Sequence, residues 1–90
     1  MSAHGNLSAR IIQYLKSVPG CRVDNRQGKG NDAGLADLYC CYNGQHYEIE
    51  IKVLPDKLSD IQRIQKTGWE DAGAVFITAY DIDDVRRIIR

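Results

Sequence analysis

The chain has 90 residues, and its twelve basic and twelve acidic side chains give a formal net charge of zero at pH 7. This length predicts one domain spanning residues 1–90 and excludes a large multidomain enzyme, while the neutral charge argues against a non-specific nucleic-acid coat protein. The composition, 43% hydrophobic and 27% charged, argues against disorder. Because no apolar run approaches 18 residues, we expect no membrane span, and because the N-terminus lacks a basic region followed by an apolar stretch, we expect no secretory signal.

Periodicity and turn signals predict seven secondary-structure elements. Apolar residues recur at helical spacing across positions 7–18, and Ser8 or Asn6 is the candidate N-cap of that helix. Asn43-Gly44 separates two segments rich in Leu, Ile, Tyr and Val, which indicates a two-residue hairpin turn. The predicted elements are a helix at 7–17, strands at 21–26, 35–42 and 45–53, a helix at 59–72, a strand at 74–79 and a helix after 81.

Capping signals mark the two later helices. Ser59 is followed three residues later by Gln62, which is a capping-box pattern, and Asp81 is the candidate N-cap of the last helix. The resulting order, α-β-β-β-α-β-α, predicts a mixed α/β domain. Ile61, Ile64, Gly68 and Ala72 continue the first of these two helices, and the positions expected to face inward from the second are Ile82, Val85, Ile88 and Ile89.

The hairpin turn determines which residues face each other across the two strands. With Asn43-Gly44 as the turn, Asp37 lies opposite Glu50, with Cβ atoms about 4.5–5.5 Å apart. Opposed carboxylates repel unless a cation neutralises them, and Mg²⁺ prefers such oxygen ligands. Lys52 shares a face with Glu50 and can reach a phosphate oxygen or an attacking water. The pattern therefore predicts a metal site for phosphodiester hydrolysis, with a solvated polar strand face as the alternative.

Four short motifs follow one another along the chain: Gly34-Leu35-Ala36-Asp37, the hairpin, Glu50-Ile51-Lys52, and Leu58-Ser59-Asp60-Ile61-Gln62. Together they resemble the virus-type replication-repair nuclease (VRR-NUC) domains of the PD-(D/E)xK nuclease superfamily. The resemblance implies a restriction-endonuclease-like fold and an endonuclease that cleaves DNA with Mg²⁺ or Mn²⁺. Because small members of the family resemble Holliday-junction resolvases, it also implies a homodimer that acts on branched DNA in repair. Such a protein would be encoded by a phage or prophage and would work in the host cytoplasm.

The resemblance assigns roles to five residues of this chain. Asp37 and Glu50 would be the metal ligands, with the main-chain carbonyl of Ile51 as a third. Lys52 would be the catalytic lysine that assists the attacking water. Gln62 would orient that water from the helix.

Two positions depart from the family pattern. Ala36 stands where the family usually has proline, which affects rigidity rather than chemistry. The family often places a glutamate in the first helix, between the positions of Asn6 and Arg10, but this chain has no acidic residue before Asp24. Three explanations remain open: the acid is dispensable, Glu48 or another carboxylate substitutes for it, or the metal binds more weakly.

Basic residues are concentrated near the start of the chain. Residues 1–34 carry five basic and two acidic side chains, whereas residues 35–60 carry two basic and five acidic ones. Arg22, Arg26 and Lys29 are therefore candidate contacts to a DNA backbone, with an ordinary solvated loop as the alternative.

The histidines and cysteines lack the spacing of a metal-binding motif. His4 and His46 are expected on the surface. The chain has an odd number of cysteines, Cys21, Cys40 and Cys41, and they form no C-x-x-C pair. A disulfide framework is therefore improbable, and a reducing cytoplasm is favoured.

Two other functions are compatible with the sequence. The first is a catalytically silent DNA-binding or assembly module on the same fold, and the second is a small interaction domain without a nucleic-acid role, which only the neutral charge supports.

A dimer would need an apolar interface, and its candidate residues are Trp69, Tyr80, Tyr39 and Tyr42.

Overall fold

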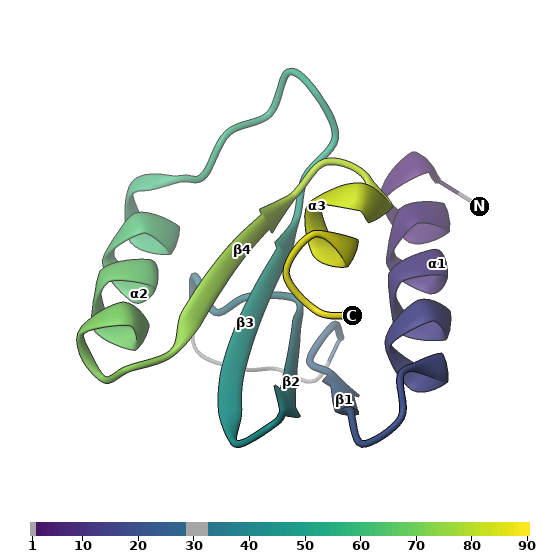
Figure 1. The fold of residues 1–90 in the computed structure, drawn as a ribbon. Helices are drawn as coiled ribbons and strands as arrows, with labels where there is room; N and C mark the ends of the chain where they lie inside the picture. Colours follow the sequence, from purple (N-terminus) through teal and green to yellow (C-terminus); the bar gives the residue numbers. More distant parts are fainter. Residues whose placement is uncertain (1, 29–32) are drawn as a thin grey trace.

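The computed structural model describes residues 2–28 and 33–90. In chain order the elements are α1 (Ala3–Ser17), β1 (Arg22–Asn25), β2 (Leu38–Tyr42), β3 (Gln45–Ile51), α2 (Asp60–Asp71), β4 (Val75–Ala79) and α3 (Ile82–Arg86). The four strands form one sheet in the order β1-β2-β3-β4, with α1 and α3 on one side and α2 on the other (Figure 1). The predicted mixed α/β class and element order are confirmed. Among the described residues, no helix is long and apolar enough to cross a membrane.

The β2–β3 hairpin has the predicted register. Tyr42 pairs with Gln45 in an antiparallel ladder, and the turn residues Asn43 and Gly44 have φ angles of 52° and 75°. Such positive φ angles at both turn residues suit an Asn-Gly pair, because glycine and asparagine tolerate this region best. β1 adds antiparallel to β2, and β4 adds parallel to β3. The carboxyl ends of β3 and β4 therefore lie side by side, next to the start of the segment that leads to α2.

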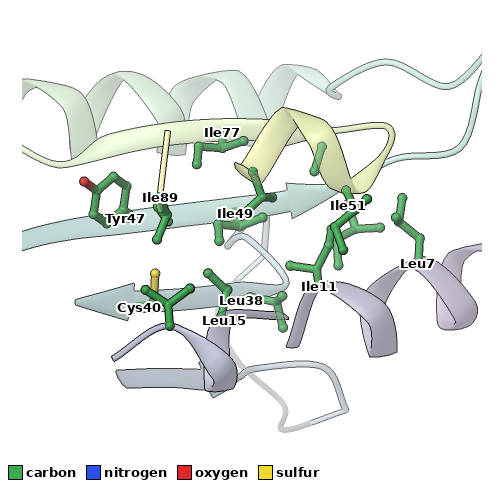
Figure 2. Close-up of a cluster of buried hydrophobic side chains, with 14 residues drawn as sticks. Leu7, Ile11, Leu15, Leu38, Cys40, Tyr47, Ile49, Ile51, Ile77 and Ile89 are labelled. Carbon is green, nitrogen blue, oxygen red and sulfur yellow. The ribbon is translucent and has the colours of Figure 1, made fainter. Parts of the chain in front are cut away.

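The hydrophobic core lies between one face of the sheet and the helices α1 and α3 (Figure 2). Leu7, Ile11 and Leu15 of α1 are buried at the four-residue spacing that places them on one helix face. The sheet residues buried against them are Leu38, Cys40, Tyr47, Ile49, Ile51, Ile77 and Ala79. Because side chains alternate along a strand, the even-numbered residues of β3 point to the opposite face, under α2.

The first helix begins earlier than its apolar pattern predicts. It starts at Ala3 with Ser2 as the N-cap, so the predicted N-caps Ser8 and Asn6 are wrong. Ser8 is buried inside the helix, and its hydroxyl accepts a hydrogen bond of 2.7 Å from Gln27 Nε2. The first turn carries no large apolar side chain, and apolar periodicity therefore misses it.

One inward-facing position predicted for the last helix is wrong, since Ile88, beyond α3, is 46% exposed. The apolar residues Ile61 and Ile64 of α2 are also exposed, at 46% and 70%. No residue of α2 is buried, because this helix covers the polar face of the sheet rather than the core. The strands also begin or end one to three residues inside their predicted limits.

Candidate active site

Asp37 lies just before β2 and is attached to the end of β3. Its main-chain carbonyl accepts a hydrogen bond of 2.8 Å from the Arg26 main-chain N–H. Its side-chain Oδ2 accepts a hydrogen bond of 3.0 Å from the main-chain N–H of Ile51 and lies 3.2 Å from His4 Nε2. The antiparallel ladder stops one residue short of Asp37, but the bond to Ile51 keeps the carboxylate next to Glu50.

Glu50 is buried in the sheet face that α2 covers. Only 4% of its surface is exposed, which excludes a solvated polar strand face. Its Oε2 accepts a hydrogen bond of 3.0 Å from Gln62 Nε2 and lies 3.6 Å from Lys52 Nζ. Its Oε1 is buried and has no hydrogen-bond partner among the described residues. A buried carboxylate oxygen without a partner is costly, and a bound cation would satisfy it.

The surroundings of Glu50 also change its pKa. Burial and the neighbouring charge of Asp37 raise the pKa of Glu50 from 4.5 to about 7, while Lys52 partly opposes this rise. Burial disfavours the charged form, and a like charge nearby does the same. At neutral pH, a divalent cation between the two carboxylates would favour their charged forms.

This shift predicts that the metal-free protein loses stability as the pH rises. The folded-state pKa of Glu50 lies above the unfolded value, so its protonation stabilises the fold fully below the unfolded pKa and this stabilisation is lost as the pH rises through about 7. We expect this group to lower the free energy of unfolding by about 2–3 kcal/mol between pH 5 and pH 8. Urea unfolding in chelator, compared between the parent and Glu50→Gln, measures it. Parallel pH profiles for the two proteins would contradict this assignment.

Gln62 connects the start of α2 to Glu50. Its side-chain Oε1 accepts a hydrogen bond of 2.9 Å from the Ser59 main-chain N–H, and the Ser59 hydroxyl accepts one of 3.2 Å from the Gln62 main-chain N–H. This is the predicted capping box. Because the amide nitrogen of the same side chain donates to Glu50, the cap also fixes the direction of Oε2.

Gly34 allows the loop before Asp37 to approach α2 closely. Its φ is +81°, and a Cβ atom at this position would lie 3.0 Å from the main-chain carbonyl of Ile61. Only glycine combines this backbone conformation with such a close approach. The glycine of the first motif therefore has a structural reason in this chain.

The donor set suits a divalent cation that takes oxygen ligands. Among the described residues, the side-chain contacts of Asp37 and Glu50 use Oδ2 and Oε2, which leaves Oδ1 and Oε1 for an ion. Within residues 2–28 and 33–90, no three His, Cys, Asp or Glu side chains form a metal-binding group. An ion would therefore need the predicted Ile51 carbonyl and water as further ligands, which is a common arrangement for Mg²⁺.

His4 is a residue of this site that the sequence did not reveal. Instead of standing alone on the surface, it contacts Asp37 from the first turn of α1, with 39% of its side chain exposed. No sequence signal marks it, because a lone histidine 33 positions before its partner belongs to no spacing motif.

Glu48 has different partners and does not substitute for the missing acid. Its side chain is fully buried, and both of its oxygens accept hydrogen bonds from the Arg26 guanidinium. His46 Nε2 also contacts Glu48, and the His46 ring stacks on Trp69 at 4.9 Å between centroids. Since Glu48 is fully engaged, it is not available as a metal ligand.

The predicted DNA-contacting residues lie in different environments. Arg22 is exposed on β1, beside a surface hollow of about 480 Å³ that Tyr39 and His46 also line. The Arg26 side chain is only 13% exposed because it pairs with Glu48. Lys29 lies outside the described residues.

The mixed sheet, with Asp37, Glu50 and Lys52 grouped at one end of β3 and α2 over its polar face, has the architecture of a restriction-endonuclease-like domain. A search of solved structures matches the chain to a protein described as a VRR_NUC domain, with a TM-score of 0.81 and 18% sequence identity, over 99% of this chain and 96% of that one. The chain therefore has the VRR-NUC fold, as its motifs predicted. No family model and no curated protein matches the sequence.

Proposed function

We propose that this chain is a metal-dependent endonuclease that hydrolyses phosphodiester bonds in DNA. The observation that carries the proposal is the buried Glu50, whose Oε1 has no partner among the described residues while Asp37 and Lys52 lie beside it. Lys52 supplies one positive charge for two neighbouring carboxylates, and a buried carboxylate oxygen is rarely left without a partner unless it serves a site. The VRR-NUC fold, together with the motif resemblance, favours a nuclease over the other hydrolases that such a site would suit.

Each residue has a defined task in the proposed reaction. Asp37, Glu50 and the Ile51 carbonyl would hold Mg²⁺ or Mn²⁺, which when bound activates water and neutralises charge on the phosphate. The Lys52 ammonium group stabilises the negative charge that develops on the phosphate and orients the attacking water. Gln62 acts through Glu50 by fixing the carboxylate, which makes it a positioning residue.

Branched DNA and a homodimer are the finer parts of the proposal. One protomer offers a single Asp37–Glu50–Lys52 group, whereas resolution of a four-way junction requires two symmetric cuts, which a two-fold dimer supplies. The aromatic residues suggested for the interface are only partly exposed. In the part of the chain that the structure describes, the large exposed apolar side chains are instead Val53, Leu54, Ile61, Ile64 and Ile88.

A cleavage assay tests the activity and the substrate together. A four-way junction, a flap and a linear duplex are each incubated with Mg²⁺, Mn²⁺ or chelator. We expect paired cuts in the junction with either metal, no cutting in chelator, and none by Asp37→Ala, which lacks a metal ligand. Asp56→Ala removes an exposed carboxylate instead and should cut like the parent. Cleavage by Asp37→Ala at the parent rate would contradict the proposed site.

Light scattering tests the dimer. The protomer mass is 10.1 kDa, so a two-fold dimer should give about 20 kDa at micromolar concentration. A stable monomer that nicks flaps or duplex ends would remove the resolvase part of the proposal and leave a monomeric nuclease.

The second candidate function is a catalytically silent DNA-binding or assembly module. Such a module would bind the junction and leave it intact with every metal. Its support is the absence of an acidic residue from α1, where the family often has a glutamate.

Under either function, we propose that the chain is a phage or prophage protein that acts in the bacterial cytoplasm. Its three free cysteines fit this reducing compartment.

A further inference from the structure

His4 reaches the proposed metal site from an element of the fold that contributes no acidic residue to it. The first turn of α1 has no acidic side chain, and the helix is anchored below that turn by Leu7 and Ile11, which are 9% and 0% exposed. Ser2, directly before Ala3, caps the N-terminus of the helix. The position of His4 is therefore determined by core packing and capping rather than by its contact with Asp37.

The contact with His4 falls on the oxygen of Asp37 that β3 already holds. Oδ2 lies 3.0 Å from the main-chain nitrogen of Ile51 and 3.2 Å from His4 Nε2. A carboxylate held by one donor can still rotate about its last side-chain bond. Two donors from two different elements, both on Oδ2, restrict this rotation and direct Oδ1 to one position.

A corresponding arrangement exists at Glu50. There Oε2 accepts a hydrogen bond of 3.0 Å from Gln62 Nε2 and lies 3.6 Å from Lys52 Nζ, while Oε1 has no hydrogen-bond partner among the described residues. In both carboxylates, two side-chain or main-chain nitrogens lie against one oxygen, and no contact among the described residues uses the other. Gln62 at Glu50 and His4 at Asp37 thus stand in the same relation to the two predicted ligands.

We propose that His4 is a positioning residue of the metal site, which donates its Nε2–H to Asp37 Oδ2 and so presents Oδ1 to the ion. This inference rests on the proposed function. It gives α1 a role in the site through a hydrogen bond instead of a ligand. Partners that orient a metal-binding group typically change metal affinity by about 10- to 100-fold when they are removed.

Calorimetric titration of the metal-free protein with Mn²⁺ tests the role of His4 without relying on activity. We expect His4→Ala to bind Mn²⁺ about tenfold more weakly than the parent, with little change in the melting temperature of the metal-free protein, because His4 is half-exposed. His4→Gln keeps a side-chain N–H donor and should restore most of the affinity. Gln13→Ala changes an exposed residue of the same helix and should bind like the parent.

Other outcomes would overturn the inference in distinguishable ways. If His4→Ala binds Mn²⁺ as tightly as the parent, or only lowers the melting temperature, His4 has no role in positioning Asp37. If pulsed electron paramagnetic resonance shows nitrogen coupling to Mn²⁺ that His4→Ala lacks, His4 is a direct ligand and not a positioning residue. If the parent binds no Mn²⁺, the proposed function fails and this inference fails with it.

Discussion

Replacement of Lys52 by alanine should lower the rate of DNA cleavage by about 10²- to 10³-fold, the usual cost of removing one group that stabilises developing charge. Lys52 follows β3 directly, its main-chain N–H donates to the Ala79 carbonyl at 2.9 Å, and its side chain is 15% exposed. This anchoring keeps Nζ beside Glu50 before any substrate arrives. DNA affinity should change little, because one phosphate contact at most is lost and the salt dependence of binding falls by about one contact.

Single-turnover cleavage and binding at several salt concentrations separate the two effects of this substitution. Lys57→Ala is the matched control, since it removes the same charge from an exposed position five residues further along the chain. It should cleave at nearly the parent rate. Loss of all DNA binding by Lys52→Ala, with metal affinity unchanged, would instead identify Lys52 as a recognition residue.

The hairpin and its carboxylates were predictable because their geometry is local. A two-residue Asn43-Gly44 turn permits one register, and side-chain alternation then decides which residues share a face. The sequence therefore predicted that Glu50 and Lys52 lie together and that Asp37 lies near them. The capping box of α2 was equally predictable, since Ser59 and Gln62 are three residues apart in the chain.

The tertiary partners of the site were not predictable in the same way. His4 contacts Asp37 across 33 positions, and Arg26, which follows β1, contacts Glu48 of β3 across 22 positions, although β2 lies between these two strands. Neither of these separations along the sequence belongs to a periodic pattern or follows from a turn rule. An arginine in a polar segment also suggests exposure and contact with DNA, whereas the Arg26 side chain is only 13% exposed.

The helix α2 shows a different limit of sequence patterns. Ile61 and Ile64 have the spacing of an inner helix face, but hydrophobic spacing does not reveal which surface a helix covers. The sheet face below α2 contains Glu48 and Glu50, so the helix meets it with Gln62, and the two isoleucines remain exposed.

Removal of the Arg26 guanidinium should be the most destabilising single change in the polar face of the sheet. Both of its terminal nitrogens donate to Glu48, whose side chain is fully buried, and the guanidinium lies 4.4 Å from the Tyr39 ring centroid and 5.6 Å from that of Trp69. Arg26→Met keeps much of the volume but leaves a buried carboxylate without its cation, which costs about 3–5 kcal/mol. A domain of this size has about 5–15 kcal/mol of stability in total, so most of the margin would be lost.

Urea unfolding at pH 7 measures this loss. One further variant serves as a control, and a double variant identifies the cause of the loss. Arg63→Ala breaks an ion pair with Asp60, whose side chain is 92% exposed, and should cost less than about 1 kcal/mol. Arg26→Met combined with Glu48→Leu removes both charges and should recover much of the stability, because the main cost of the single change is the unpaired buried charge. If the double variant is no more stable than Arg26→Met, the aromatic contacts of the guanidinium, rather than its pairing with Glu48, hold this face together.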